Sequence, residues 1–125
     1  MAAAGEVFGA FRLIALLGRG GVAEVWKAEH VELGSLHAVK LLSIHSDGLQ
    51  QRLLAEGRAQ ATLDHPNIVR VTDIVRDRGT LGLVMELVEG PTLDRWIRAN
   101  WAMNQVESIF RGICAGVKAA HAAGL

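Results

Sequence analysis

The first third of the chain consists of short hydrophobic runs that are separated by glycine and polar residues. Runs of this length, rich in β-branched and other apolar residues, are typical of strands. The pattern therefore predicts strands over residues 11–17, 24–30 and 36–42. Because a short glycine-rich turn joins the first two strands, we expect them to pair as an antiparallel hairpin.

A helical pattern follows the third predicted strand. Ser46 or Asp47 is placed to cap a helix that continues to about residue 63. The segment Asp64-His65-Pro66-Asn67 should end it, because the residue before a proline disfavours the helical conformation. Gly57 lies inside this helix, where glycine costs up to about 1 kcal/mol relative to alanine, and the sequence offers no reason for it.

The rest of the chain changes from strands to helices. Strands are predicted over residues 68–75 and 81–87, followed by a short helix that Thr92 caps and a longer helix over residues 104–123. Five strands with one inserted helix, then helices, indicate an α+β fold with an antiparallel sheet. A change of composition near Gly90 suggests two subdomains, residues 1–88 and 89–125.

Charge and composition exclude several classes of protein. Thirteen basic and thirteen acidic residues balance, so the sequence predicts no basic surface for nucleic acid. Half of the residues are hydrophobic, which is high for a soluble domain. Either the genome favours Ala, Leu and Val, or some apolar faces are meant to pack against a part of the protein that is missing. Both explanations stay open.

Cysteine and hydropathy bear on the cellular setting. Cys114 is the single cysteine, so an internal disulfide and a thiolate metal cluster are both impossible within this chain. No apolar run approaches the roughly 18–20 residues that span a bilayer. The N-terminal segment lacks the basic start of a signal peptide. These features predict a cytoplasmic location and no membrane span.

Lys40 and Glu56 are the most informative pair of charges. Lys40 lies in an apolar strand, on the same face as Ala38, because alternate strand residues share a face. Glu56 lies on the same helix face as Leu49, Leu53, Gln60 and Leu63, so we expect it on the buried stripe. A buried carboxylate needs a cationic partner, and Lys40 is the best candidate. Taken singly, each charge could equally be an ordinary solvated side chain.

The turn between the first two strands is rich in glycine. Gly18, Gly20 and Gly21 leave backbone N–H groups accessible, which suits the binding of phosphate. Strand-forming Val25 and Trp26 follow, so the turn is predicted to be a hairpin flap rather than the start of a helix. A simple hairpin turn is the alternative for this short motif.

In their order along the chain, these features resemble the ATP-binding lobe of bacterial serine/threonine protein kinases. Gly18, Gly20 and Val25 match the family pattern G-x-G-x-x-G-x-V, whereas Ala23 replaces the third glycine. The resemblance continues through the segment His65-Pro66-Asn67-Ile68-Val69 and covers about residues 11–125. It implies a kinase-like N-lobe with a five-stranded sheet and one helix, then a hinge and two C-lobe helices.

The resemblance also implies the roles of individual residues. Lys40 would contact the α- and β-phosphates of ATP, and Glu56 would orient it. The glycine turn would cover the phosphates, Leu17 and Val25 would cover the adenine, and Met85 would border the back pocket. The implied nucleotide-binding residues are Leu17, Gly18, Arg19, Gly20, Gly21, Val25, Ala38, Lys40, Met85, Glu86 and Val88, the last two through backbone groups.

The parent reaction of such a kinase transfers the γ-phosphate of ATP to protein hydroxyls. The resemblance places the catalytic loop and the Mg²⁺ ligands beyond Leu125, so the chain alone is expected to bind nucleotide weakly and not to phosphorylate. Its expected partners are ATP, a protein substrate and the missing C-lobe in cis. His65 and His121 are interpreted as structural, and Asp94 as a candidate contact to ribose.

Two other functions remain open at this point. The chain could be a non-catalytic nucleotide-sensing or interaction module that docks through its apolar last helix. It could also be an unrelated α+β domain whose motifs are accidental. Absence of a contact between Lys40 and Glu56 would favour the second of these alternatives.

Overall fold

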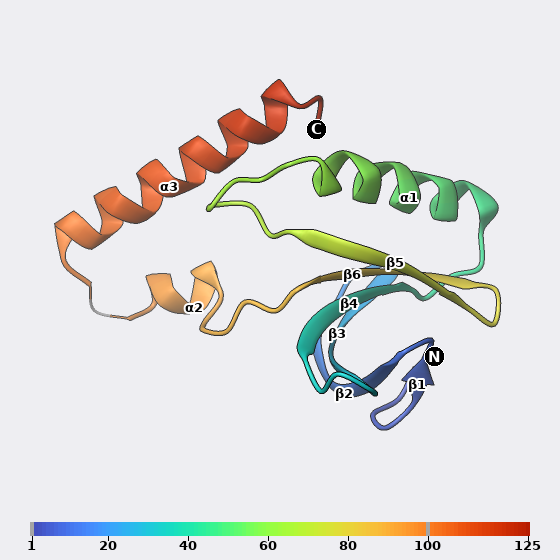
Figure 1. Ribbon diagram of the computed structural model, residues 1–125. Helices are drawn as coiled ribbons and strands as arrows, with labels where there is room; N and C mark the ends of the chain where they lie inside the picture. Colours follow the sequence, from blue (N-terminus) through green and yellow to red (C-terminus); the bar gives the residue numbers. More distant parts are fainter. Residues whose placement is uncertain (1, 100) are drawn as a thin grey trace.

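The structure is a computed structural model, and it describes residues 2–99 and 101–125. Its centre is an antiparallel sheet of six strands in the order β1-β2-β3-β4-β6-β5. Helix α1 lies over one face of the sheet, and α2 and α3 follow the last strand (Figure 1). The strands are β1 (Val7–Phe8), β2 (Phe11–Arg19), β3 (Ala23–His30), β4 (Leu36–Leu42), β5 (Val71–Asp77) and β6 (Thr80–Glu86). The helices are α1 (Asp47–Ala61), α2 (Leu93–Ile97) and α3 (Met103–Ala122).

The α+β class is confirmed, and the number of strands is corrected from five to six. The additional strand is β1, in which Val7 pairs with Arg12 and Phe8 with Phe11. Two residues are too few to show a strand period, so the sequence pattern did not predict this strand. Strand β5 begins three residues later than expected, because Ile68 donates a backbone hydrogen bond to His65 in the preceding turn.

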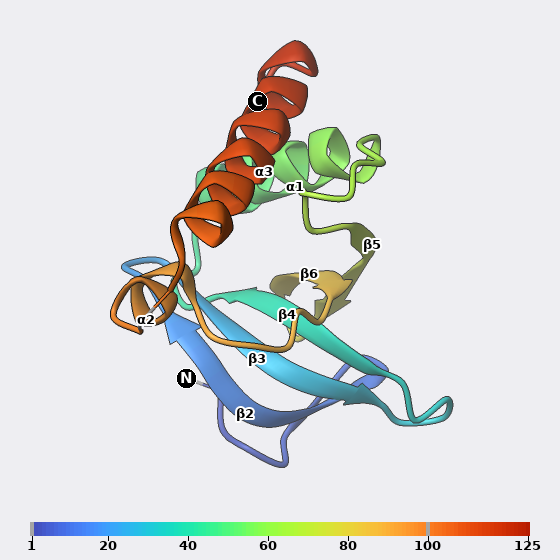
Figure 2. The ribbon, with the colours of Figure 1, turned by 90° about the vertical axis from the view of Figure 1, so that its left-hand side faces the viewer.

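The sheet is curled (Figure 2). One hydrophobic core is built on the face of the sheet that is turned away from α1. Its residues come from β1, β2, β3, β4 and β6 and are Phe8, Phe11, Leu13, Trp26, Ala28, Val39, Leu41 and Val84. Alternate positions on these strands supply this face, as the period of a strand requires. The residues that alternate with them point to the opposite face of the sheet, where α1 packs as a second layer.

A second, smaller core joins α1 to that opposite face. Leu53 of α1 packs with Leu81 and Leu83 of β6. Gly57 allows this close approach, because a Cβ atom at that position would lie 2.6 Å from Cδ2 of Leu83. The structure thus explains the glycine in this helix. Ser46 caps the helix as expected, since its hydroxyl accepts a hydrogen bond from the Leu49 N–H.

Helix α3 leaves much of its apolar stripe exposed. Ile109, Phe110, Ile113 and Val117 are 40, 65, 44 and 47% exposed, and Gly116 is the buried position of this helix. The helix approaches the rest of the molecule at Asn67, whose backbone oxygen would lie 2.9 Å from a Cβ atom at Gly116. In the described parts of the chain, no helix is long and apolar enough to cross a membrane.

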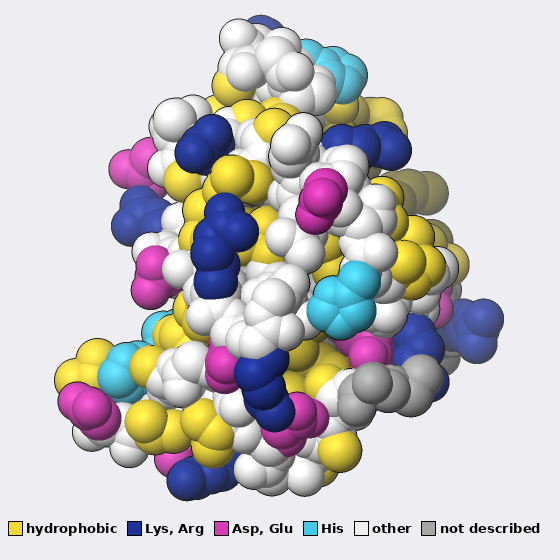
Figure 3. Space-filling model, turned by 90° about the vertical axis from the view of Figure 1, so that its right-hand side faces the viewer, with side chains coloured by type: hydrophobic (Ala, Val, Ile, Leu, Met, Phe, Trp, Pro, Cys, Tyr) yellow, Lys and Arg dark blue, Asp and Glu magenta, His cyan; other side chains and the backbone are white. Residues whose placement is uncertain are grey.

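Charged side chains of both signs are interspersed on the face shown in Figure 3. No patch of one sign forms there. This distribution agrees with the balanced formal charge of the sequence, and on this face it offers no extended basic surface to a polyanion.

Candidate functional site

The register of the sheet gathers five of the predicted site residues on one face. Gly18 lies opposite Val25, and Val25 lies opposite Lys40. One row along, Ala38 lies opposite Met85. Directly opposed residues of antiparallel strands project to the same face, so these side chains share the face on which α1 packs.

Lys40 and Glu56 meet at the edge of this face. Their Nζ and Oε1 atoms are 3.4 Å apart, which confirms the expected contact between strand and helix. The expected burial of Glu56 is wrong, because its side chain is 51% exposed and that of Lys40 is 30% exposed. Leu53 and Gly57 form the buried line of α1 instead, since the missing side chain of Gly57 lets that line lie closest to β6.

The glycine hairpin has an open tip. Gly18 is part of β2, and the tip is closed by hydrogen bonds from Gly20 N to Ala23 O (2.8 Å) and from Ser43 N to Val22 O (2.9 Å). A Cβ atom at Gly18 or Gly21 would meet nothing within 4 Å. The space around these two positions is therefore open, and the binding of phosphate by the tip stays a prediction.

The side chain of Arg19 lies on the other face of the hairpin. Arg19 is opposed to Glu24, one position along from the pair of Gly18 and Val25, so the two pairs project to opposite faces. Its Nη2 atom lies 3.1 Å from Oε2 of Glu24. The structure does not bring this side chain together with Lys40, and only the backbone of Arg19 remains a candidate nucleotide contact.

Sequence reasoning missed Glu24. Its side chain is 3% exposed although it carries a carboxylate. A signal was available, because Glu24 alternates with Trp26 and Ala28 and therefore shares their inward face. The strand over residues 24–30 was predicted from its apolar run, and alternation along it was not used to ask which of its charges is buried.

The remaining predicted residues lie at the two ends of the face. Leu17 lies at an irregularity of register between Leu16 and Gly18, and it is 52% exposed. Glu86 ends β6, and its carboxylate accepts a hydrogen bond from the Arg70 N–H at 2.9 Å. Val88 follows outside regular secondary structure and is 66% exposed. These positions leave the segment after β6 open to a ligand.

Thr92 and Asp94 differ from the expected arrangement. Thr92 occupies the cap position of α2, but its hydroxyl donates to the Asp94 carboxylate instead of capping the helix backbone. This hydrogen bond is the main reason why the pKa of Asp94 is lowered from its ordinary value. This shift favours the charged form of Asp94, and a contact of this residue with ribose stays a prediction.

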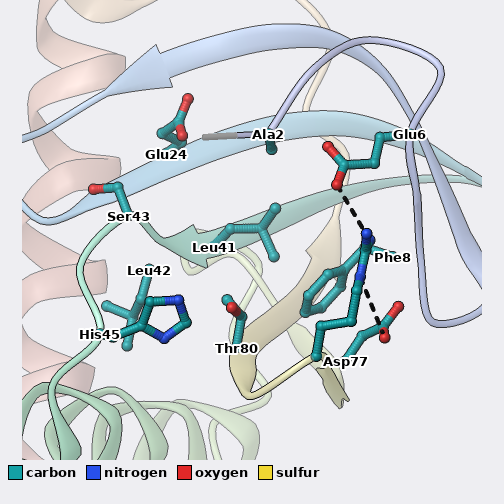
Figure 4. Close-up of a pocket in the computed structure, with 11 residues that line it drawn as sticks. Ala2, Glu6, Phe8, Glu24, Leu41, Leu42, Ser43, His45, Asp77 and Thr80 are labelled. Carbon is teal, nitrogen blue, oxygen red and sulfur yellow. Dashed lines mark ion pairs between the residues drawn. The ribbon is translucent and has the colours of Figure 1, made fainter.

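A cavity of about 250 Å³ lies away from the predicted site (Figure 4). It is bordered by the N-terminal segment, the end of β4 and the turn between β5 and β6. Glu6, Asp77 and Arg78 form an ion-pair network on one side, and Glu24 lies on another. Neither Lys40 nor Glu56 lines this cavity. Among the residues described, no group of three His, Cys, Asp or Glu could hold a metal ion.

Comparison with known proteins decides the family. The family described as the protein kinase domain matches residues 11–125. The chain belongs to this family. Serine/threonine-protein kinase Pkn1 of Myxococcus xanthus is 39% identical over 120 residues, covering 94% of this chain and 17% of that protein. PrkC of Bacillus subtilis, also a serine/threonine-protein kinase, is 31% identical over 121 residues, covering 93% of this chain and 19% of its own length.

Solved structures agree with this assignment. A kinase domain of PknI from Mycobacterium tuberculosis superposes with a TM-score of 0.79 at 26% identity, covering all of this chain and 53% of that one. Rad53 in complex with AMP-PNP superposes with a TM-score of 0.78 at 28% identity, covering 93% of this chain and 31% of that one. The chain thus spans about half of the PknI domain and less than a fifth of the two curated relatives. It has the fold of a kinase N-lobe followed by helices, as the sequence predicted.

Proposed function

We propose that this chain is the ATP-binding portion of a serine/threonine protein kinase. The single observation that carries the proposal is the Lys40–Glu56 ion pair, with an N···O distance of 3.4 Å. The pair lies on the face that Val25, Ala38 and Met85 share. A lysine ammonium is a compact charge that suits phosphate oxygens, and an adjacent carboxylate restricts where it points.

ATP would lie along this face with its adenine near the end of β6 and its phosphates beneath the glycine tip. Ala38 leaves room for the flat base, while Val25 and Leu17 cover it and Met85 borders its inner edge. Backbone groups of Glu86 and Val88 would pair with the adenine edge. Backbone N–H groups of the glycine tip would face the phosphates, apart from that of Gly20, which donates to Ala23 O. No neighbouring atom blocks the approach at Gly18 or Gly21.

The parent reaction would move the γ-phosphate of ATP to a hydroxyl of a protein substrate, with Mg²⁺ neutralising the phosphate charge. Within residues 1–125 we assign Lys40 and Glu56 to phosphate positioning, and we assign the Mg²⁺ ligands and the acceptor of the hydroxyl proton to sequence beyond Leu125. The chain alone would then bind nucleotide weakly without phosphorylating. We further propose that residues 1–88 form the N-lobe and residues 89–125 the start of a C-lobe that packs in cis, in a cytoplasmic protein.

Calorimetric titration of the 125-residue chain with ATP tests the proposal. Substitution of Lys40→Met removes the ammonium group while keeping much of the apolar side chain, so ATP affinity should fall about tenfold or more. Lys118→Met is the matched control, because Lys118 is exposed on α3. Its affinity should equal that of the unsubstituted chain.

Equal affinities of Lys40→Met and the unsubstituted chain would disprove the assigned role of Lys40.

A second function has its own supporting observation, namely the exposed apolar stripe of α3 that includes Phe110 and Ile113. A chain that forms a concentration-dependent dimer and shows no response to ATP would be such a non-catalytic interaction module. The titration and the association measurement together separate the two functions.

A further inference from the structure

Glu24 is a buried carboxylate that the proposed nucleotide site does not use. Its side chain is 3% exposed and lies at the start of β3, directly after the glycine tip. It borders the cavity behind the hairpin (Figure 4). Carboxylates are seldom buried to this degree without a cation, because desolvation of the charge is costly. The position therefore calls for a specific account.

The cation is Arg19, at the end of β2. Nη2 of Arg19 lies 3.1 Å from Oε2 of Glu24, and the two residues are the last opposed pair before the tip. They project to the face opposite Val25 and Lys40, because adjacent positions on a strand alternate between faces. The ion pair thus joins the two strands directly beneath the tip, on the side turned away from the proposed nucleotide.

The tip itself has few other restraints in the described structure. One backbone hydrogen bond closes it, from Gly20 N to Ala23 O, and another ties Val22 O to Ser43 N at the end of β4. A Cβ atom at Gly21 would meet nothing within 4 Å, so this position has open space in the direction in which a side chain would point. The orientation of the tip therefore depends on how firmly its base is held.

We propose that Arg19 and Glu24 are a positioning pair, which holds the glycine tip where its backbone N–H groups reach the phosphates of the nucleotide. Neither side chain touches the nucleotide. The inference rests on the proposed function, because it assigns a role within the same ATP site. Loss of the pair lets the tip adopt orientations that do not bind phosphate, and apparent affinity falls in proportion to the binding-competent fraction.

This mechanism predicts an effect that depends on the phosphates. The tip covers phosphates, whereas the adenine and ribose rest on Ala38 and the segment after β6. Glu24→Gln should therefore weaken ATP binding about fivefold, as expected if one tip in five remains competent, and change adenosine binding by less than about twofold. A pair that only supported folding would change both affinities alike, or neither.

Titration of the 125-residue chain with ATP and with adenosine is the test, and the readout is the ratio of the two affinities. The reversed pair Arg19→Glu/Glu24→Arg should restore the ratio, since it keeps opposite charges at the two positions. Glu107→Gln, which removes an exposed ion pair with Arg111 on α3, is the control and should leave the ratio unchanged. If Glu24→Gln does not fold, as judged by circular dichroism, Arg19→Gln takes its place, because it removes the positive charge of the pair at the half-exposed position.

The outcomes separate this inference from the proposed function. An unsubstituted chain that binds neither ATP nor adenosine refutes the proposed function and the inference with it. An unsubstituted chain that binds ATP, with the same ATP-to-adenosine ratio in the variant at Glu24 or its substitute at Arg19, refutes the inference alone. A lowered ratio that the reversed pair restores supports it.

Discussion

Lys40 and Glu56 form a partly exposed ion pair. We therefore expect the pair to contribute to ATP binding but little to the stability of the fold. The Glu56 side chain is 51% exposed, and exposed ion pairs contribute only about 0–1 kcal/mol to folding. Glu56→Gln should therefore leave the free energy of unfolding within about 1 kcal/mol of the unsubstituted value. ATP affinity should nevertheless fall several-fold, because the orientation of the Lys40 ammonium is no longer fixed by charge.

Urea denaturation and calorimetric titration with ATP measure these two quantities on the same samples. Asp64→Asn is a matched control, because Asp64 forms an exposed ion pair with Arg70, at 2.7 Å, outside the face that holds Lys40. It should change neither quantity. A large loss of stability in Glu56→Gln without any change in ATP affinity would contradict the positional role of the pair.

For Lys40 and Glu56, the sequence predicted the face of the strand or helix on which each side chain lies, but not how deeply the side chain is buried. Strand and helix periods placed Lys40 and Glu56 on facing sides, and their contact is confirmed. The same periods could not show that Gly57 brings α1 close to Leu83, which leaves Glu56 at the edge. Arg19 was assigned to the nucleotide as part of the glycine turn, although strand register directs its side chain to Glu24. Register between strands is a tertiary property, and a single-strand pattern does not contain it.

At the scale of elements, the packing of α1 on β6 depends on Gly57. Alanine would favour the helix by up to about 1 kcal/mol, but its Cβ atom would lie 2.6 Å from Cδ2 of Leu83, which is 1% exposed. Overpacking a filled core typically costs about 1–3 kcal/mol, so Gly57→Ala should destabilise the chain by about 1–2 kcal/mol net. Urea denaturation measures the difference.

Gly48→Ala is the control for helix propensity alone, because a Cβ atom there would come no closer than 3.8 Å, to the Ser46 hydroxyl oxygen. This variant should be neutral or stabilised by up to about 1 kcal/mol. If Gly57→Ala is stabilised to the same degree, the close approach of α1 and β6 does not occur in solution.

Elements with a strong local pattern were predicted well. Strand β4 (Leu36–Leu42) has the predicted bounds, and the order of the later elements is confirmed. Strand β1 (Val7–Phe8) was missed, because its two residues are defined by pairing with β2 rather than by a period of their own. Strand β5 begins later than expected because Ile68 is bonded to His65 in the turn and the Arg70 N–H donates to the Glu86 carboxylate, which leaves residues 68–70 outside the strand.

At the scale of the whole molecule, the structure consists of a well-packed part and a loosely attached one. The two hydrophobic cores lie within the sheet and α1. Helix α3 instead meets the rest of the molecule at Asn67, which faces Gly112 and Gly116. The exposed side chains of Phe110 and Ile113 favour the second explanation of the apolar composition, in which some faces are built to be covered.

This difference in packing predicts a difference in local stability within one chain. Segments with few buried apolar contacts open at a small free-energy cost, whereas core strands exchange their amides only on global unfolding. Amide hydrogen exchange should therefore be much faster in α3 than in β4, where Val39 is fully buried. Equal protection of the two elements would contradict the division of the chain into two subdomains near Gly90. Asn67→Ala supplies the variant, because loss of the asparagine side chain beside Gly112 should speed exchange in α3 further while leaving β4 unchanged.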